Sequence, residues 1–415
     1  MKVLIIGSGA REHALAWKIS QSRKVDQIFI LPGNGGAEDI GINIPADPMD
    51  FEQVYQIIQE RKITLTVVGP ELPLSEGIVD YLMERGVKVF GPVKDAARLE
   101  ASKVFSKELM RKYQVPTAEF AVFSDYKEAC TYLEGRKFPL VVKADGLAAG
   151  KGVVICENIE SGRDALREMI VAGKFGEAGK SVVIEEYIQG EEVSLLALTD
   201  SYTILPLVPA RDYKRALEGN LGKNTGGMGA IADMNLLTPD MQEKIISTIL
   251  QPVIQGLKAQ GIIYQGILYA GIIFKDGEPF VLEFNCRFGD PETQVILPLL
   301  ENDLADLFLA TIHSNLEKMK LTWKNKVSLG VVMSSRGYPE QYDKGQEIKL
   351  GQIPDDVFLF HAGTERKDGK LLVNGGRVLN LVTTAKNVNF CREVLYEAIK
   401  SVEFEKMYYR KDIGL

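Results

Sequence analysis

Short apolar runs alternate with amphipathic stretches over the first hundred residues. The apolar runs are rich in β-branched residues and end at Gly or Pro, which predicts strands at 2–7, 27–34, 64–71 and 87–92. Helical periodicity fills the intervals between them, with one helix expected between 71 and 87. Strands separated by helices predict a parallel sheet with right-handed crossovers. We therefore expect a Rossmann-like domain over residues 1–102.

The pattern changes after residue 102. A basic helix is predicted over 103–113, and Pro116 stops it. Hairpin-like strands then predict an α+β central region over 103–323. Within it, the lobe at about 123–189 is expected to be a mobile lid. Helices are expected at 161–172, 239–261 and 304–316. From residue 324, strands separated by Pro-Gly turns predict a small β-rich domain that extends to 415. The expected fold is thus multidomain, part α/β and part α+β.

One predicted strand, VLEFNCRFGDPE from Val281, carries opposite chemistry on its two faces. Successive side chains of a strand point to opposite sides of a sheet. The alternation predicts an apolar face of Leu282, Phe284 and Cys286, and a polar face of Glu283, Asn285 and Arg287. Hard cations take oxygen ligands, and Arg supplies a planar fork for phosphoryl oxygens. The strand therefore favours a site for magnesium and phosphate together.

The alternative is an amphipathic strand with one solvated face. The turn that follows weighs against this alternative, because Asp290 and Glu292 place two more carboxylates at the end of the strand. Sheets of α/β proteins bind their ligands at such ends.

A glycine-rich loop, KADGLAAGKGV, follows another predicted strand that ends near Lys143. Its Gly146, Gly150 and Gly152 leave amides unhindered around Lys151, so the loop could close over a triphosphate. It is not a Walker A motif, which needs Ser or Thr after the lysine, whereas Gly152 follows Lys151. The alternative is a flexible hairpin tip with a solvated lysine.

Two further segments carry candidate contacts. Main-chain groups at 185–188 could bind an adenine edge, and Glu192 could accept from ribose hydroxyls; a solvated acidic turn is the alternative. The run NTGGMGA at 224–230 has too many glycines for a helix or strand. It is expected to be a substrate-facing loop, with an ordinary surface turn as the alternative.

The opening turn contains Gly7 and Gly9 but has Glu12 where a dinucleotide fingerprint needs its third glycine. The acidic residue expected after the second strand is also missing. Three interpretations stay open: an NAD site, backbone amides that hold a phosphate monoester, and a tight turn that packs helix on strand.

Composition limits the partners. A hydrophobic fraction of 46% with 25% charged residues is ordinary for a soluble globular protein. The net charge of -7 gives no basic surface for nucleic acid or an anionic membrane. Four scattered cysteines predict reduced, mostly buried thiols, and three histidines are too few for a histidine metal cage. No apolar run resembles a signal peptide or a membrane span, so we expect a cytoplasmic protein.

Taken in order, the motifs resemble the ATP-grasp superfamily and, within it, the phosphoribosylamine-glycine ligase family. The segments that carry the resemblance are GSGAREHALAWK at 7–18, VGPELPLSEG at 68–77, KADGLAAGKGV at 143–153, NTGGMGA at 224–230, EFNCRFGDPETQ at 283–294, FHAGT at 360–364 and NGGRV at 374–378. The resemblance covers essentially the whole chain, and it implies a ligase region without further fused domains.

The resemblance implies an ATP-dependent reaction of purine biosynthesis. ATP would phosphorylate the carboxylate of glycine, and the amine of 5-phosphoribosylamine would attack the acyl phosphate. The products would be glycinamide ribonucleotide, ADP and phosphate. The implied cofactor is Mg2+ or Mn2+, the partners are these small molecules alone, and the expected state is a monomer.

The resemblance also implies roles for individual residues. Those that would contact ATP are Lys103, Lys143, Gly150, Lys151, Gly152, Glu185, Glu186, Tyr187, Ile188 and Glu192. The metal ligands would be Glu283 and Asn285. The catalytic residues would be Arg287, Asp212, Lys214 and Asn224. Substrate contacts would come from Gly9, Asn34, Gly226, Gly227, Asp290, Asn374, Gly375, Gly376 and Arg377.

Several positions depart from the family pattern: Tyr213 replaces His, Lys223 replaces Pro, Ala10 replaces Gly, and Ile231–Asp233 replaces Tyr-Ser-Pro. These changes concern the substrate loop and the opening turn. Two other functions stay open: a different ATP-grasp carboxylate ligase, since the fold does not fix the acceptor, and a nucleotide-sensing module without turnover. The presence of Lys103, Lys143 and the polar strand residues favours an enzyme, because a sensor needs no transfer machinery.

Overall fold

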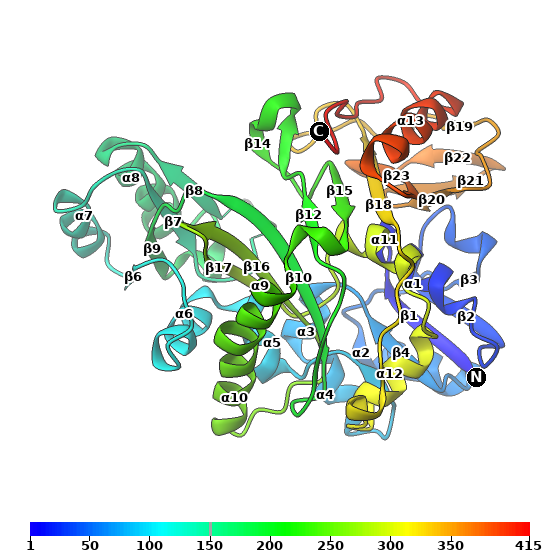
Figure 1. Ribbon diagram of the computed structural model, residues 1–415, viewed down its shortest axis with the longest axis horizontal. Coiled ribbons are helices and arrows are strands. Elements are labelled where there is room, and N and C mark those ends of the chain that lie inside the picture. Colours follow the sequence, from blue (N-terminus) through cyan, green and yellow to red (C-terminus); the bar gives the residue numbers. More distant parts are fainter. Residues whose placement is uncertain (149–151) are drawn as a thin grey trace.

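The computed structural model describes residues 1–148 and 152–415. Its amino-terminal part is a parallel sheet in the order β3-β2-β1-β4-β5, shown in blue in Figure 1. The strands are β1 Lys2–Gly7, β2 Gln27–Pro32, β3 Ile42–Asn43, β4 Leu65–Val68 and β5 Val89–Phe90. The predicted Rossmann-like sheet is confirmed.

Helices connect these strands or follow the last of them. They are α1 Ala10–Ile19, α2 Phe51–Arg61, α3 Glu71–Glu76, α4 Ile78–Met83, α5 Lys94–Ala101 and α6 Lys103–Lys112. The sequence predicted one helix between β4 and β5, whereas the structure has α3 and α4. Gly77 separates them because its φ of 93° lies in the left-handed region, which ends a helix. Helix α6 confirms the predicted basic helix, with Ser102 as its N-cap.

The lobe at one side of Figure 1 is an antiparallel sheet in the order β6-β9-β7-β8. Its elements are β6 Phe120–Phe123, α7 Tyr126–Glu134, β7 Leu140–Ala144, β8 Val153–Cys156, α8 Ile159–Leu166 and β9 Val182–Glu186. Its own apolar core includes Val142, Leu166 and Ile184. The mobility expected of this lobe stays a prediction.

A nine-stranded sheet crosses the rest of the protein in the order β17-β16-β10-β12-β15-β18-β23-β20, with β11 beside β10. The strands are β10 Glu191–Thr199, β11 Ile204–Pro206, β12 Ala210–Asp212, β15 Gly229–Ala232, β16 Gly266–Lys275, β17 Glu278–Asn285, β18 Val327–Ser334, β20 Val357–His361 and β23 Arg377–Ala385. Ala230 of β15 pairs with Gly330 of β18. The sheet is therefore continuous across residue 324, where the sequence suggested a new domain.

Smaller elements cover this sheet. The helices are α9 Pro239–Ile245, α10 Gln251–Ala259, α11 Glu292–Ile296, α12 Leu304–Ile312 and α13 Val388–Ala398. A π-helical turn at Ile246–Leu250 joins α9 to α10, so the helix predicted over 239–261 is almost continuous. Two hairpins complete the fold, β13 Arg215–Leu217 with β14 Leu221–Asn224 and β21 Thr364–Lys367 with β22 Lys370–Val373, and β19 Lys349–Leu350 pairs with the distant β24 Val402–Glu403.

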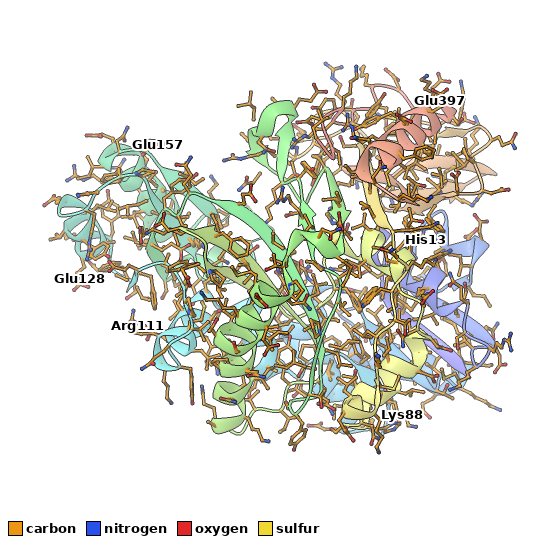
Figure 2. All side chains as sticks on the ribbon, viewed as in Figure 1. His13, Lys88, Arg111, Glu128, Glu157 and Glu397 are labelled. Atoms are coloured by element: carbon orange, nitrogen blue, oxygen red, sulfur yellow. The ribbon has the colours of Figure 1, made fainter. Side chains whose placement is uncertain are left out.

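The amino-terminal and carboxyl-terminal parts are held together around α1. Trp17 packs against Phe358 with ring centroids 4.9 Å apart. The backbone N–H of His361 donates to Nδ1 of His13 at 2.8 Å, and Asn34 Nδ2 donates to the carbonyl of His361 at 2.8 Å. Figure 2 labels His13 at this junction. The contacts fix β20 against the opening turn of the chain.

Two expectations from composition can be compared with the described residues. Cys156, Cys286 and Cys391 are buried and Cys130 is partly buried, and all four are free thiols. The prediction of mostly buried, unbridged thiols is confirmed. Within residues 1–148 and 152–415, the helices are all too short or too polar to cross a membrane.

Candidate active site

A cavity of about 400 Å³ lies where the amino-terminal part, the lobe and the nine-stranded sheet meet. Many of the predicted site residues line it: Lys103, Lys143, Gly152, Asp212, Lys214, Gly226, Glu283, Asn285, Arg287, Asp290 and Arg377. They come from distant parts of the sequence, and the fold brings them to one space. Gly150 and Lys151 lie outside the described residues.

Lysines from two elements form one wall. Lys143 on β7 pairs with Glu185 on β9, which also pairs with Lys107 on α6. Burial alone would raise the pKa of Glu185, but Lys143 and Lys107 together lower it. Lys103 donates to the carbonyl of Gly146 at 2.8 Å, and burial lowers its pKa. The wall is thus a preformed, net positive surface.

Lys107 was not among the site residues predicted from the sequence. It stands four residues after Lys103 on α6, a spacing that places both on one face of a helix. That spacing was the available signal.

The predicted adenine segment at 185–188 and the ribose residue Glu192 do not line the cavity. Glu186 pairs with Lys275 at 2.7 Å, Tyr187 is half-buried, and Ile188 is buried against Ala118 and Ile273. The Glu192 carboxylate lies 3.5 Å from Lys214 Nζ.

The polar strand β17 holds Glu283 and Asn285 toward the cavity, as the alternation predicted. Leu282 is an exception. A register shift pairs Gly271 with Glu283 and Ile272 with Val281, so Leu282 is an extra, bulged residue. It packs beside Phe280 rather than with Phe284 and Cys286.

The bulge has a chemical consequence, because the freed carbonyl of Leu282 accepts from Lys143 Nζ at 3.2 Å. Placing Leu282 on the apolar face was therefore wrong. Alternation along a strand fails where one residue has no partner on the neighbouring strand.

Lys214 stands among three carboxylates. Its Nζ lies 3.5 Å from Glu192, 3.8 Å from Glu283 and 4.0 Å from Asp212. Asp212 raises the pKa of Lys214. Burial raises the pKa of Asp212 itself to about 7. The ammonium is thus held charged, while the buried carboxyl group beside it can exchange a proton near neutral pH.

Arg287 is clamped by two acidic residues that sequence analysis did not assign. Its Nη2 lies 2.9 Å from Glu100 on α5, and its Nε lies 3.3 Å from Glu71 on α3. Burial would lower the pKa of Arg287, but Glu100 and Glu71 outweigh it and raise that pKa. Glu71 falls in the VGPELPLSEG segment that carries the resemblance, but nothing local in the sequence links either carboxylate to Arg287.

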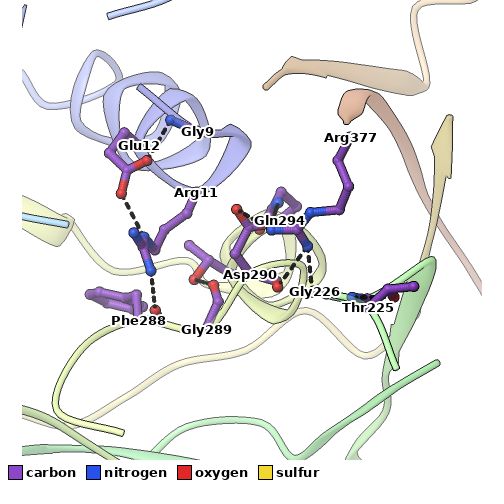
Figure 3. Close-up of polar contacts among 12 residues, drawn as sticks. Gly9, Arg11, Glu12, Thr225, Gly226, Phe288, Gly289, Asp290, Gln294 and Arg377 are labelled. Carbon is purple, nitrogen blue, oxygen red and sulfur yellow. Dashed lines mark hydrogen bonds and ion pairs between the residues drawn. The ribbon is translucent and has the colours of Figure 1, made fainter. Parts of the chain in front are cut away.

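Arg377 joins the substrate loop to the turn after β17, as Figure 3 shows. Its Nη2 lies 3.2 Å from the Asp290 carboxylate, and its Nη1 donates to the carbonyls of Asp290 and Gly226. Gly227 needs to be glycine, because its φ is 110° and a Cβ there would lie 2.4 Å from Pro291. The three predicted residues Gly226, Asp290 and Arg377 are therefore one connected unit.

The opening turn is closed by Glu12. Its Oε2 accepts from the N–H of Gly9 at 2.7 Å, and its Oε1 lies 2.5 Å from Arg11 Nε. Arg11 in turn donates to the carbonyl of Phe288 at 3.2 Å. A carboxylate of the chain thus occupies the helix start where an NAD pyrophosphate would bind. This arrangement disfavours a dinucleotide site and also occupies the amide predicted to contact substrate.

Four other predicted substrate residues, and the predicted catalytic residue Asn224, do not line the cavity. Asn34 donates to the carbonyls of Ser8 and His361 at 3.0 and 2.8 Å, and it is buried. Asn374 N donates to the carbonyl of Gly363, and Gly375 lies against Gly363. Gly376 lies against the ring of Tyr338, and Asn224 is exposed on β14. Their proposed roles in binding or catalysis stay predictions.

The residues at the end of β17 fit a divalent cation. In the described part of the chain, His, Cys, Asp and Glu form no group of three or more arranged around a metal position. Glu283 and Asn285 offer a carboxylate and an amide to the cavity, and Lys214, Lys143 and Lys103 outweigh burial to lower the pKa of Glu283. Two protein oxygen ligands beside a lysine-lined wall are what a metal shared with nucleotide phosphates requires.

Comparison with known proteins identifies the family. Models of the phosphoribosylglycinamide synthetase N domain, ATP-grasp (A) domain and C domain match residues 1–100, 101–293 and 328–415. A phosphoribosylamine-glycine ligase of Halalkalibacterium halodurans is 44% identical over 415 residues, which cover 100% of this chain and 96% of that protein. The chain belongs to the phosphoribosylamine-glycine ligase family.

Solved structures agree. The crystal structure of the Thermotoga maritima phosphoribosylamine-glycine ligase matches with a TM-score of 0.87 and 36% identity, and it covers 100% of both chains. The biotin carboxylase domain of a Hydrogenobacter thermophilus 2-oxoglutarate carboxylase, in complex with MgADP and bicarbonate, matches with a TM-score of 0.74 at 18% identity, over 98% of this chain and 91% of that one. The second match shows the shared ATP-grasp fold. The predicted superfamily and fold class are confirmed.

Two departures from the phosphoribosylamine-glycine ligase pattern have structural partners. Lys223 forms an ion pair with Glu340. Tyr213 accepts at its hydroxyl from the N–H of Gly414 at 2.9 Å. Lys223, on β14, and Tyr213, two residues before β13, therefore both contact the carboxyl-terminal part of the chain.

Proposed function

We propose that this protein joins glycine to 5-phosphoribosylamine at the expense of ATP, in purine biosynthesis, through a glycyl phosphate intermediate. The observation that carries the proposal is the cavity itself. It brings Lys103 and Lys143, the oxygen ligands Glu283 and Asn285, and the clamped Arg287 around one space. The family relationship over the full chain supports the same reaction.

The lysine wall and the glycine loop would bind the triphosphate. Lys103 and Lys143 would neutralise phosphate charge, and Gly146 and Gly152 would lie against the nucleotide. Glu283 and Asn285 would hold Mg2+ or Mn2+. When bound, the ion neutralises charge on the phosphate oxygens. Positioning and charge neutralisation are the main requirements of phosphoryl transfer.

Arg287 would stabilise the transferred phosphoryl group. Glu71 and Glu100 hold its guanidinium at Nε and Nη2, so little reorganisation is needed when charge develops. Lys214 would attract the carboxylate of glycine. Asp212, whose pKa burial raises to about 7, is suited to accept a proton from the attacking amine.

The ribosylamine would enter beside Arg377. Among the substrate residues predicted from the sequence, Gly9 and Asn34 already use their donors within the protein. Arg377 also donates within the protein, to the carbonyls of Gly226 and Asp290, but its guanidinium has five N–H donors, lines the cavity and remains positively charged. We assign it to the phosphate of the acceptor substrate.

The decisive experiment traces the carboxylate oxygen of glycine into the released phosphate. Glycine labelled with heavy oxygen in its carboxylate is supplied with ATP, a divalent ion and fresh 5-phosphoribosylamine. One labelled atom should appear in the released phosphate per turnover, because an acyl phosphate leaves one glycine oxygen on phosphorus. Product formation with unlabelled phosphate would overturn the intermediate, and the absence of glycine-dependent ADP release would overturn the function.

We further propose that the enzyme works as a cytoplasmic monomer and accepts either Mg2+ or Mn2+. Sedimentation at several protein concentrations tests the first point, with one species of 46.0 kDa expected. Parallel titrations of the two metal ions with ATP and glycine present test the second.

A further inference from the structure

The carboxyl-terminal segment, residues 408–415, folds back onto the β13–β14 hairpin, next to the mark C in Figure 1. Arg410 is its buried centre, with 1% of its surface exposed. Its Nη1 donates to the carbonyl of Arg215 at 2.9 Å, and its Nη2 donates to Asn220 Oδ1 at 3.2 Å. One guanidinium thus reaches both a strand of the hairpin and its tip.

Asp412 completes the charge pair. Arg410 Nε and Nη2 donate to its two carboxylate oxygens at 2.7 and 2.6 Å, which is the bidentate geometry of a strong pair. The same carboxylate accepts from the N–H of Gly219 at 2.8 Å in the hairpin tip. Arg410 is buried and Asp412 is partly buried, and both bind the hairpin.

Two more contacts hold residues 408–415 in place. Gly414 N donates to the hydroxyl of Tyr213, which stands directly before Lys214. Ile413 is fully buried, and a Cβ on Gly229 would lie 2.8 Å from it. The segment is therefore packed into the sheet on one side and bonded to the hairpin on the other.

Both ends of this hairpin enter the cavity. Lys214 precedes β13 and Thr225 follows β14, and both line the cavity. Thr225 donates from its N–H and its hydroxyl to the carbonyl of Lys214, each at 2.8 Å. A shift of the hairpin would therefore move Lys214 and Gly226 together. The proposed ATP and metal residues come from other elements: α6, β7 and β17.

We propose that Arg410 is a positioning residue that fixes the acceptor side of the active site through the β13–β14 hairpin. The inference rests on the proposed ligase reaction. Loss of the Arg410 contacts should loosen the hairpin, misplace Lys214 and Gly226, and leave the nucleotide side intact. A misplacement of about 1 Å at a distance from the chemistry can lower a rate by on the order of 100-fold.

The test compares Arg410→Met and Arg410→Lys with the parent protein. Three quantities are measured: affinity for a nonhydrolysable ATP analogue with Mg2+, kcat and KM of ligation for glycine, and hydrogen exchange of the amides of 215–224. For Arg410→Met we expect analogue affinity within about 2-fold, glycine kcat/KM reduced roughly 10- to 100-fold, and faster exchange in the hairpin. Arg410→Lys keeps the charge but loses the planar fork. Its glycine kcat/KM and its hairpin exchange should lie between those of the parent and those of Arg410→Met.

Tyr396→Phe is the matched control. The Tyr396 hydroxyl donates to the carbonyl of Arg410 at 2.8 Å from α13, so its loss weakens the same segment without removing a hairpin contact. It should leave the glycine kcat/KM within about 2-fold, since one peripheral hydrogen bond is lost. If Arg410→Met does not fold, Asn220→Gly removes one Arg410 acceptor and suits the φ of 56° at that position.

Two results would overturn the inference. One is unchanged hairpin exchange and unchanged ligation in Arg410→Met or Asn220→Gly. The other is an equal loss of analogue affinity and ligation, which indicates general destabilisation. A parent protein that binds the analogue but makes no product would instead refute the proposed function.

Discussion

At the scale of single residues, the polar end of β17 gives the sharpest test of the site. Glu283→Gln and Asn285→Ala should each abolish most metal-dependent turnover and leave the fold intact, because both side chains line the cavity. We expect the transition state to lose about 3 kcal/mol of stabilisation, by analogy with other lost electrostatic contacts. Steady-state rates over a metal titration measure this loss.

Glu278→Gln is the matched control for this prediction. Glu278 lies on the same strand, but it is exposed and pairs with Lys244 at 2.6 Å. It should keep parental activity. Parental rates at saturating metal in both cavity variants would show that these residues are not the ligands.

The lysine wall gives a second prediction at this scale. Glu185→Gln removes the one carboxylate between Lys107 and Lys143 and leaves two buried ammonium groups side by side. Breaking a buried ion pair costs about 3–5 kcal/mol. Lys107→Met should cost less, because Glu185 keeps Lys143 as its partner. Urea unfolding of the parent, Glu185→Gln and Lys107→Met measures their unfolding free energies. A larger loss of unfolding free energy in Lys107→Met than in Glu185→Gln would contradict the prediction.

Some of these site residues could be predicted from the sequence pattern and others could not, for a physical reason. Strand alternation correctly placed Glu283 and Asn285 together, since that geometry is local. It misplaced Leu282, because a bulge depends on the neighbouring strand. It could not link Glu71 and Glu100 to Arg287, because those contacts form only when α3 and α5 pack against the turn after β17.

At the scale of elements, the β7–β8 loop is expected to respond to nucleotide. Asp145 at its start accepts from Ser102 and from the N–H of Val104 at the beginning of α6, and Lys103 donates to Gly146. The amides of Gly146 and Gly152 should exchange more slowly once phosphates bind them, with an ATP analogue and Mg2+. Exchange in the β21–β22 pair provides the internal control. Unchanged exchange at saturating nucleotide would show that the loop does not clamp the phosphates.

Element prediction succeeded where the signal was periodic and local. Helix α6 and the parallel sheet of the amino-terminal part follow directly from such patterns. The break at Gly77 was missed because the glycine was taken as part of one helix. The continuity of the sheet from β15 to β18 was missed because almost a hundred residues separate those strands, and no local pattern encodes such a pairing.

At the scale of the whole molecule, the buried histidines tie stability to pH. His13 accepts a hydrogen bond from the N–H of His361 while it is neutral, and burial lowers its pKa to about 3. Burial also lowers the pKa of His361 to about 4. Protonating His13 would remove an acceptor and place a charge between the amino-terminal and carboxyl-terminal parts. The neutral histidines are therefore required by the junction shown in Figure 2.

The direction in which pH changes the unfolding free energy follows from the difference between the folded and unfolded pKa values of His13. The unfolded chain protonates His13 near its ordinary pKa of about 6.5, whereas the folded protein does so only near 3. Stability from this group is complete above about pH 6.5 and is lost as pH falls toward 3, by about 5 kcal/mol in all. His13→Asn keeps a short acceptor without a proton to gain, so its unfolding free energy should depend less on pH between 6.5 and 4. His313→Asn changes an exposed histidine and should keep the parental slope. Equal slopes in all three proteins would show that the His13 junction does not set the acid sensitivity of the molecule.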